Sequence, residues 1–256
     1  MHSIIAVSII ATLQQGMGIK YKVNEEFFDK WSSQMAYVLG LLYADGSLED
    51  ASYLRGKYIR LTSTDKELIF RVRRWLDSEH TIIYLKPDSL HGKQRYFLRI
   101  GSHKLYNSLT KLGLYPNKFL TIKFPNIPSK YLKDFIRGYF DGDGCVYLEL
   151  SKNQNHNIVI KKLSIIFTSG SKKFLQGLNS AIKQILEVNQ NNIYTSHRSF
   201  QLRYFTKDSI KVFKFMYQNS HYEYYLKRKF DIFGKYFKIR PSTIDRSIKH
   251  ILMARW

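Results

Sequence analysis

VLGLLYADG at residues 38–46 and IRGYFDGDG at residues 136–144 repeat one pattern at two places in the chain. Each copy has a glycine, Gly40 or Gly138, four residues before a second small residue, and each copy ends in Asp-Gly. A stripe of small residues lets two helix backbones approach more closely than leucine-lined faces allow. The pattern therefore predicts two similar helices that pack directly against each other.

Capping signals give the expected bounds of these two helices. Ser32 or Ser33 can begin the first helix, and apolar residues follow at helical spacing up to Gly46, which we expect to supply a left-handed stop. Residues 128–129, Pro-Ser, open the second helix, and Gly144 closes it in the same way. If the helices pair, their C-terminal ends lie side by side.

Those ends carry Asp45 and Asp143, although the last turn of a helix is already partly negative and two neighbouring carboxylates repel each other. A cation is expected there. Carboxylates, together with the terminal carbonyls of Ala44 and Gly142, suit Mg²⁺, which takes its other ligands from water and substrate phosphates. Mn²⁺ is an alternative, and Ca²⁺ is expected to bind without turnover. Metals held in this way can activate a water and stabilise the leaving oxygen in phosphodiester hydrolysis.

The paired motifs resemble those of the LAGLIDADG homing endonucleases, in the single-chain form with two motif copies. The second copy is the more specific match, whereas the first has Tyr43 where many members have an acid. The resemblance implies a monomeric, site-specific DNA endonuclease of introns or inteins that makes a staggered double-strand break across a minor groove. It also implies a long, largely asymmetric DNA target and catalytic roles for Asp45 and Asp143.

Two other interpretations of the motifs fit the residues less well. Unrelated helices also end in small residues and Asp-Gly, but two copies in equivalent context disfavour coincidence. A calcium loop at DGDG would have Cys145 and Lys152 where oxygen ligands are required, so we reject it. Two alternatives stay open: a splicing maturase that binds intron RNA, and a catalytically silent DNA-binding protein of the same fold.

The composition indicates a polyanionic partner. The 256 residues include 41 Lys plus Arg against 20 Asp plus Glu, giving a formal charge of +21. This charge is interleaved with 15% aromatic residues and is not gathered into one amphipathic membrane helix, which favours nucleic acid over a membrane. Cys145 is the single cysteine, so an intramolecular disulfide is excluded.

The N-terminal residues carry a short apolar run at positions 4–13. It is too short to span a bilayer and has no preceding Lys or Arg, so we expect neither a transmembrane helix nor a secretory signal. An intracellular protein, of a prokaryotic cytoplasm or of an organelle, is the expectation.

The same order of predicted elements follows each motif. Strand and helix patterns predict strands ending at residues 57–63, a helix at 65–76, strands at 81–85 and 94–100, and a helix at 103–112. The second copy repeats them with helices at 172–187 and 209–217 and strands at 193–195 and 200–205. The expected fold class is therefore α+β, with two pseudo-symmetric αββαββα halves, the motif helices at the axis and, by the resemblance, antiparallel saddle-shaped sheets facing DNA. The expected divisions are an N-terminal extension (1–23), a first half (24–113), a linker (114–129), a second half (130–236) and a basic C-terminal tail (237–256).

Strand alternation selects the residues that would face nucleic acid. Arg99 and Arg203 stand at equivalent places in FLRI and QLRY, and the resemblance implies a basic residue of this strand near the cleavage centre. The alternative, in which they contact distal phosphates or solvent, stays open. Lys229 of the expected closing helix is taken as available to phosphates. Further predicted DNA contacts, each of which could also be a solvated surface residue, are Tyr58, Arg60, Arg95, Lys162, Ser164, Arg198, Gln201, Lys227 and Arg228.

Overall fold

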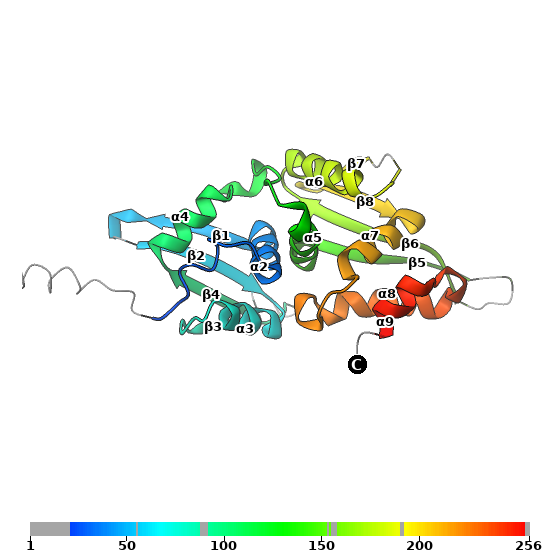
Figure 1. Ribbon diagram of the computed structural model, residues 1–256, viewed down its shortest axis with the longest axis horizontal. Helices are drawn as coiled ribbons and strands as arrows, with labels where there is room; N and C mark the ends of the chain where they lie inside the picture. The colour runs from blue at the N-terminus through cyan, green and yellow to red at the C-terminus, as the bar shows by residue number, and fades with distance from the viewer. Residues whose placement is uncertain are drawn as a thin grey trace, which may run out of the picture.

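The computed structural model describes residues 21–54, 56–87, 92–152, 154, 158–189 and 192–253. The apolar run at residues 4–13 and the last three residues of the predicted tail lie outside them. Two similar halves lie side by side, with one long helix from each at the centre (Figure 1). This arrangement confirms the α+β fold predicted from the repeated motif.

Each half has the predicted αββαββα order. The first contains α2 (Ser33–Ala44), β1 (Gly46–Ala51), β2 (Gly56–Ser63), α3 (Lys66–Trp75), β3 (Ile82–Leu85), β4 (Arg95–Gly101) and α4 (His103–Lys111). The second contains α5 (Ser129–Asp143), β5 (Gly144–Lys152), β6 (Ile158–Ser169), α6 (Lys172–Ile185), β7 (Ile193–Ser196), β8 (Ser199–Phe205) and α7 (Thr206–Tyr217). Short 3₁₀ turns are η2 (Ser52–Leu54), η3 (Lys118–Leu120), η4 (Tyr222–Tyr224) and η5 (Pro241–Thr243).

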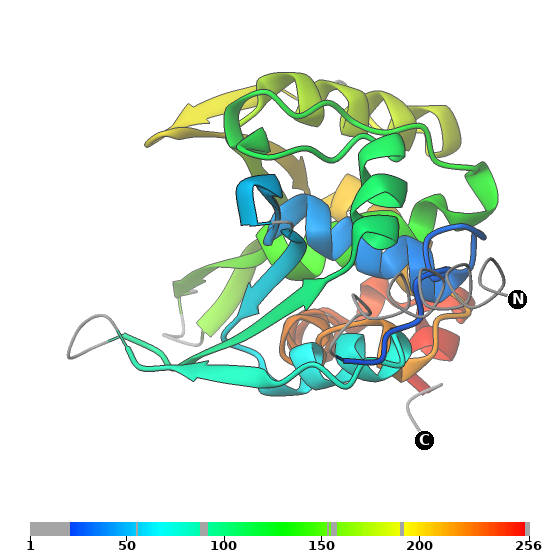
Figure 2. The ribbon, with the colours of Figure 1, turned by 90° about the vertical axis from the view of Figure 1, so that its left-hand side faces the viewer.

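The two sheets have matching topologies, β1-β2-β4-β3 and β5-β6-β8-β7, and every pairing is antiparallel. Gly46 pairs with Leu61 where β1 begins, and Gly144 pairs with Phe167 at the same place in the second sheet. The strands of both sheets extend toward one side of the molecule, whereas most helices lie on the other side (Figure 2). Each sheet therefore keeps one face free of helices.

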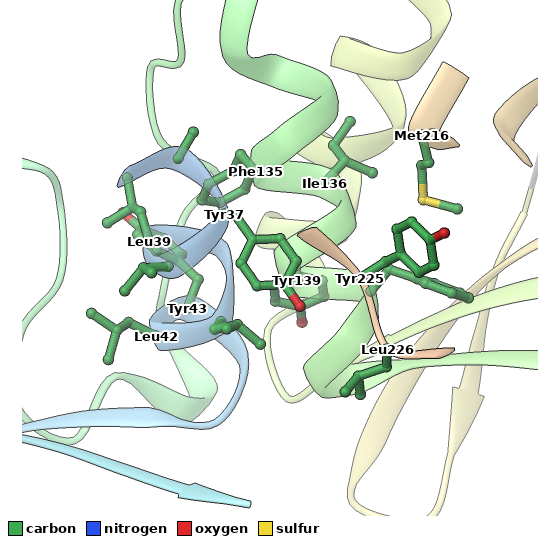
Figure 3. Packing of buried hydrophobic residues seen from close by; sticks show 14 of the residues in the cluster. Tyr37, Leu39, Leu42, Tyr43, Phe135, Ile136, Tyr139, Met216, Tyr225 and Leu226 are labelled. Atoms are coloured by element: carbon green, nitrogen blue, oxygen red, sulfur yellow. The ribbon is translucent and has the colours of Figure 1, made fainter. Parts of the chain in front are cut away.

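Helices α2 and α5 touch along the predicted glycine stripe. A Cβ atom added at Gly40 would lie 2.1 Å from the Phe135 carbonyl oxygen, and one at Gly138 would lie 2.0 Å from the Tyr37 carbonyl oxygen. Aromatic side chains fill the space beside this contact, as the rings of Tyr43 and Phe135 do at 5.3 Å between centroids (Figure 3). The direct helix pairing predicted from the sequence is confirmed.

The predicted left-handed stops at the two motif glycines are wrong. Gly144 has φ −97° and ψ 157°, and Gly46, which likewise begins a strand, is absent from the positive-φ residues of the described chain. Instead, the space that a side chain would occupy at each glycine is already filled by the preceding helix. A Cβ at Gly46 would lie 2.6 Å from the Leu42 Cα, and one at Gly144 would lie 2.5 Å from the Phe140 carbonyl oxygen. Glycine is needed because, after each motif helix, the backbone turns directly into a strand that lies against the last turn of that helix.

The residues after α7 form two packed helices. Helix α8 (Lys227–Ile239) continues beyond the predicted boundary at 236, and α9 (Arg246–Met253) follows in the segment predicted as a tail. Ile248 and Ile251 of α9 are buried, so these residues belong to the folded core. Within the described ranges, no helix is both long and apolar enough to cross a membrane.

Candidate functional site

The two motif aspartates meet at the same end of the central helix pair. Asp45 is the C-cap of α2, and Asp143 is the last residue of α5. A Cβ added at Gly142 would lie 2.4 Å from the Ala44 Cβ and 3.1 Å from Asp45 Oδ2, so the Asp45 carboxylate rests against the end of α5. The condition set by the sequence, that the helix ends lie side by side, is met.

The protein around these carboxyl groups disfavours their charged form. Removal of water raises the pKa of both, and the neighbouring Asp45 charge helps to raise the pKa of Asp143 to about 6. Asp45 is nevertheless exposed and Asp143 half-buried, so solutes can reach them. A cation at this place would favour both charged carboxylates.

Two buried lysines flank the acidic centre. Lys118, in η3, donates from Nζ to the Tyr43 carbonyl oxygen at 3.0 Å and so caps the end of α2. Lys229, in α8, donates to four carbonyl oxygens at the end of α5, those of Phe140 (2.6 Å), Asp141 (2.8 Å), Gly142 (3.3 Å) and Gly144 (2.6 Å). Burial lowers the pKa of both lysines. Asp143 and Asp45 act in the opposite direction on Lys118, and Asp141 and Asp45 do so on Lys229.

Sequence reasoning missed Lys118 and placed Lys229 on the surface. They are 9% and 5% exposed respectively, because each ammonium group turns inward to the last carbonyls of a motif helix. One signal could have found them: each lysine follows the last helix of its half, and so occupies an equivalent place in the repeat. A comparison of the two halves beyond the motifs would have paired them.

Two clefts contain Asp45. One has a volume of about 460 Å³ and is lined by the start of β1, by Arg60 and by residues 115–119 of the linker. The other has a volume of about 340 Å³ and is lined by Asp45, Thr62, Ser63, Thr64, Asp65, Arg95, Asp141, Gly142 and Arg228. The acidic centre is therefore reached past linker residues in one cleft and past two arginines in the other.

The donor set fits Mg²⁺ better than a metal that needs a closed protein cage. The described part of the chain has no group of three or more His, Cys, Asp or Glu that could hold a metal. Mg²⁺ binds through one or two carboxylates and completes its shell with water and substrate phosphates, which Asp45 and Asp143 can accommodate. Of the predicted carbonyl ligands, Ala44 lines the larger cleft, and Gly142 already accepts a long hydrogen bond from Lys229.

Arg99 and Arg203, predicted at the cleavage centre, line neither cleft. Arg99 donates to both carboxylate oxygens of Glu49, at 3.2 and 3.1 Å, and its guanidinium lies 3.4 Å from the centre of the Tyr58 ring. Arg203 donates to Gln201 Oε1 at 3.1 and 2.6 Å and lies over the ring of Tyr194. Both arginines are therefore held on the surface of a sheet by side chains from the strands of that sheet.

Arg95, by contrast, lines the smaller cleft that contains Asp45. Residues 95, 97 and 99 share one face of β4, but the strand is seven residues long, and its first residue is the one at the acidic cleft. Alternation identified the correct face of the strand, whereas it could not identify which end approaches the helix pair. An arginine that shares a cleft with a motif aspartate was thus predicted only as a DNA contact.

The remaining predicted DNA contacts divide by exposure. Arg60 and Lys162 are exposed, and each is paired with one glutamate, Glu49 at 3.6 Å or Glu149 at 3.6 Å. Arg198 is exposed in the β7–β8 turn with φ 52°. Ser164 is a correction: it is only 5% exposed, because it lies on the central strand β6 between Tyr147 of β5 and Phe205 of β8.

Lys227 and Arg228 begin α8 and differ in their surroundings. Lys227 is exposed and pairs with Asp231 one turn further along the helix, at 2.7 Å. Arg228 reaches across to the first half and donates to Asp65, with Nε to Oδ1 at 2.8 Å and Nη2 to Oδ2 at 2.7 Å. Of the two, only Arg228 lines a cleft that contains Asp45.

Comparisons with known proteins agree with this architecture. A sequence model of the LAGLIDADG-like domain matches residues 130–216. The LAGLIDADG homing endonuclease I-LtrWI, solved bound to target DNA, superposes with a TM-score of 0.56 at 12% identity, covering 91% of this chain and 97% of that chain. The chain has the LAGLIDADG homing endonuclease fold. I-DmoI, solved in complex with DNA and Ca, shares this fold with a TM-score of 0.50 at 20% identity, covering 82% of this chain and 99% of that chain. The resemblance seen in the two motifs is supported by the domain match over the second copy and by the fold.

Two curated relatives match this chain over part of their own, longer sequences. A probable translation initiation factor IF-2 of Methanocaldococcus jannaschii is 26% identical over 200 residues, which are 73% of this chain and 15% of that protein. A reverse gyrase of the same organism is 27% identical over 195 residues, which are 76% of this chain and 10% of that protein. The chain thus spans a small part of the length of either relative.

Proposed function

We propose that this chain is a site-specific DNA endonuclease that makes a staggered double-strand break by divalent-metal-dependent hydrolysis. The observation that carries the proposal is the acidic centre itself. Asp45 and Asp143 lie at the meeting ends of α2 and α5, and each helix end is capped by a buried lysine. Two acids from two halves of one chain provide a site for each DNA strand, so a monomer suffices.

The residues around the centre support hydrolysis of a phosphodiester. Asp45 and Asp143 would hold Mg²⁺ or Mn²⁺, which when bound activates water and neutralises charge on the leaving oxygen. Lys118 and Lys229 would place their ammonium groups beside the centre, at the carbonyls that end α2 and α5, as the phosphate becomes more negative. The exposed arginines and lysines of the two sheets would neutralise DNA phosphates, so binding should weaken steeply as salt rises.

The relatives favour a mobile module. An initiation factor and a reverse gyrase have different names and tasks, yet a segment similar to this chain occupies 15% of one and 10% of the other. A segment carried by two such different proteins is best explained as a unit that moves between genes. This agrees with an intron- or intein-associated enzyme acting on a long, largely asymmetric DNA site.

A cleavage experiment tests the proposal. Wild-type protein is incubated with a library of long randomised duplexes, with and without Mg²⁺, and the broken ends are sequenced. We expect Mg²⁺-dependent breaks with staggered ends at one preferred sequence. Asp45→Asn and Asp143→Asn should abolish cutting, whereas Asp77→Asn should not. Asp77 is an exposed control with φ 44°, a conformation that asparagine adopts readily.

The outcomes separate the competing functions. Cutting that survives both Asp45→Asn and Asp143→Asn contradicts the proposed centre. Tight binding of a duplex without cutting would indicate a silent DNA-binding protein, and tight binding of a structured intron RNA without cutting would indicate a maturase. Thermal unfolding of each variant verifies that lost cutting does not come from lost folding.

A further inference from the structure

The ion pair between Asp65 and Arg228 joins the two halves beside the acidic centre. Arg228 belongs to the first turn of α8, and Asp65 immediately precedes α3 in the other half. Two short hydrogen bonds connect them, at 2.8 and 2.7 Å. Asp65 occupies the N-cap position of α3 but makes no side-chain capping bond, because its carboxylate faces the guanidinium instead. The pair therefore replaces the ordinary use of an aspartate at a helix start.

The pair leaves part of the guanidinium available. The Asp65 side chain is 20% exposed, whereas the Arg228 side chain is 55% exposed, so the carboxylate is the anchor and the guanidinium lies toward solvent. Asp65 engages Nε and Nη2, and among the described residues Nη1 donates to no acceptor. An arginine held by one edge presents its remaining donors in a fixed direction.

The available donors lie where DNA would approach Asp45. The cleft of about 340 Å³ contains Arg228 and Asp45 together with Thr62 and Arg95. Thr62 and Arg95 lie on the helix-free face of the first sheet, the face that carries the exposed Arg60. A phosphate entering from that face meets Arg228 as it reaches the aspartate.

The positions that correspond to Asp65 and Arg228 in the repeat do not form an equivalent pair. Lys118 and Lys229 are counterparts, so the residue that corresponds to Arg228 is Asn117. Ser171, which precedes α6, corresponds to Asp65, and it is 2% exposed and occupied by bonds to the Phe174 amide and the Ile122 carbonyl. Neither residue can supply a carboxylate or a guanidinium.

We infer that Asp65 positions Arg228 to bind a phosphate of one DNA strand only, which makes the two strand cuts depend on different residues. The inference rests on the proposed endonuclease function. A guanidinium binds two oxygens of a phosphate at once and stabilises the charge that grows there during cleavage. Because the two scissile phosphates lie on opposite strands, one Arg228 serves one of them.

Strand-resolved cleavage tests the inference. A duplex with the sequence cut by wild-type protein carries a different fluorophore at each 5′ end, and both cuts are timed in a single turnover. Arg228→Gln should slow one cut about 100-fold and leave the other within about twofold, so nicked DNA accumulates. Asp65→Asn should slow the same cut by a smaller factor, and Arg228→Lys should fall between wild type and Arg228→Gln. Arg74→Gln, which removes another arginine ion pair between the halves (Arg74 with Glu223) outside both clefts that contain Asp45, is the matched control.

A binding measurement without divalent metal gives a second readout. Fluorescence anisotropy across a salt series should show that Arg228→Gln lowers the salt slope of binding by about one phosphate contact, whereas Asp65→Asn changes it less. If both cuts slow equally, and only in proportion to lost thermal stability, the pair merely joins the halves and the inference is overturned. If wild-type protein cuts nothing, the proposed function fails, while an unchanged salt slope in Arg228→Gln would separately exclude the phosphate contact.

Discussion

Gly138→Ala tests whether the close approach of α2 and α5 sets both the stability and the acidic centre. The added methyl carbon would lie 2.0 Å from the Tyr37 carbonyl oxygen and 2.8 Å from its carbonyl carbon. An ordinary contact needs about 3.5 Å, so the methyl is about 1.5 Å too close to an atom of the backbone. Neither helix has a flexible side chain to move at that point, so the helices must separate.

The expected cost follows from this overlap. Extra methyl groups in a tightly packed core destabilise by about 1–3 kcal/mol, and a clash with backbone belongs at the upper end, about 3 kcal/mol. In a protein of this size, each kcal/mol lowers the unfolding midpoint by about 2–4 °C, so the midpoint should fall by about 6–12 °C. Cutting should fall as well, because separation of the helices moves Asp45 away from Asp143.

Gly234→Ala is the matched control for this measurement. Gly234 lies inside α8, and a Cβ added there has no atom within 4 Å. Alanine is the better helix former by about 1 kcal/mol, so this variant should unfold at or slightly above the wild-type midpoint. Urea and thermal unfolding followed by circular dichroism measure both variants. Equal midpoints for Gly138→Ala and Gly234→Ala would refute the close-packing argument.

Two further substitutions test buried polar groups. Lys229→Met removes the donor shared by the last carbonyls of α5. We expect the free energy of unfolding in urea to fall by about 3 kcal/mol, with little residual cutting. Lys227→Met, at an exposed residue, should change the free energy of unfolding by less than about 0.5 kcal/mol. His80 accepts a bond from the Gly101 amide, and burial lowers its pKa below the ordinary value of about 6.5, so protons bind the unfolded chain more strongly. Wild-type stability should therefore fall between pH 7 and pH 5 more steeply than that of His80→Gln, and identical pH slopes would contradict this account.

The repeat predicted the fold well because its information is local. Glycine spacing, Ser32 at the start of α2 and Pro-Ser at the start of α5 each act within a few residues, and the structure places the helix ends as expected. The paired strands and helices after each motif follow in the predicted order. The reason for Gly46 was wrong, since the sequence cannot distinguish a left-handed turn from a position that is filled by the preceding helix turn.

The site was predicted less completely because it joins distant segments. A lysine in a linker or an amphipathic helix looks solvated in sequence, and only tertiary packing turns Lys118 and Lys229 inward. Likewise, alternation gives the face of β4 but not its approach to the helix pair, so Arg99 was preferred to Arg95. For Ser164, too, alternation gives the face of the strand but not the exposure, because bulky residues on neighbouring strands can bury a small outward-facing side chain.

The one departure in the first motif, Tyr43, has a physical explanation in the repeat. Tyr43 stands at the position that Asp141 occupies in the second motif. The Tyr43 hydroxyl donates to the Leu112 carbonyl at 2.7 Å, and the Asp141 carboxylate accepts from the Leu226 amide at 2.8 Å. Each of these contacts fixes the segment that leads to the buried lysine of its half. A phenol needs an acceptor and a carboxylate needs a donor, so the two halves diverged in chemistry while both kept the lysine anchored beside its aspartate.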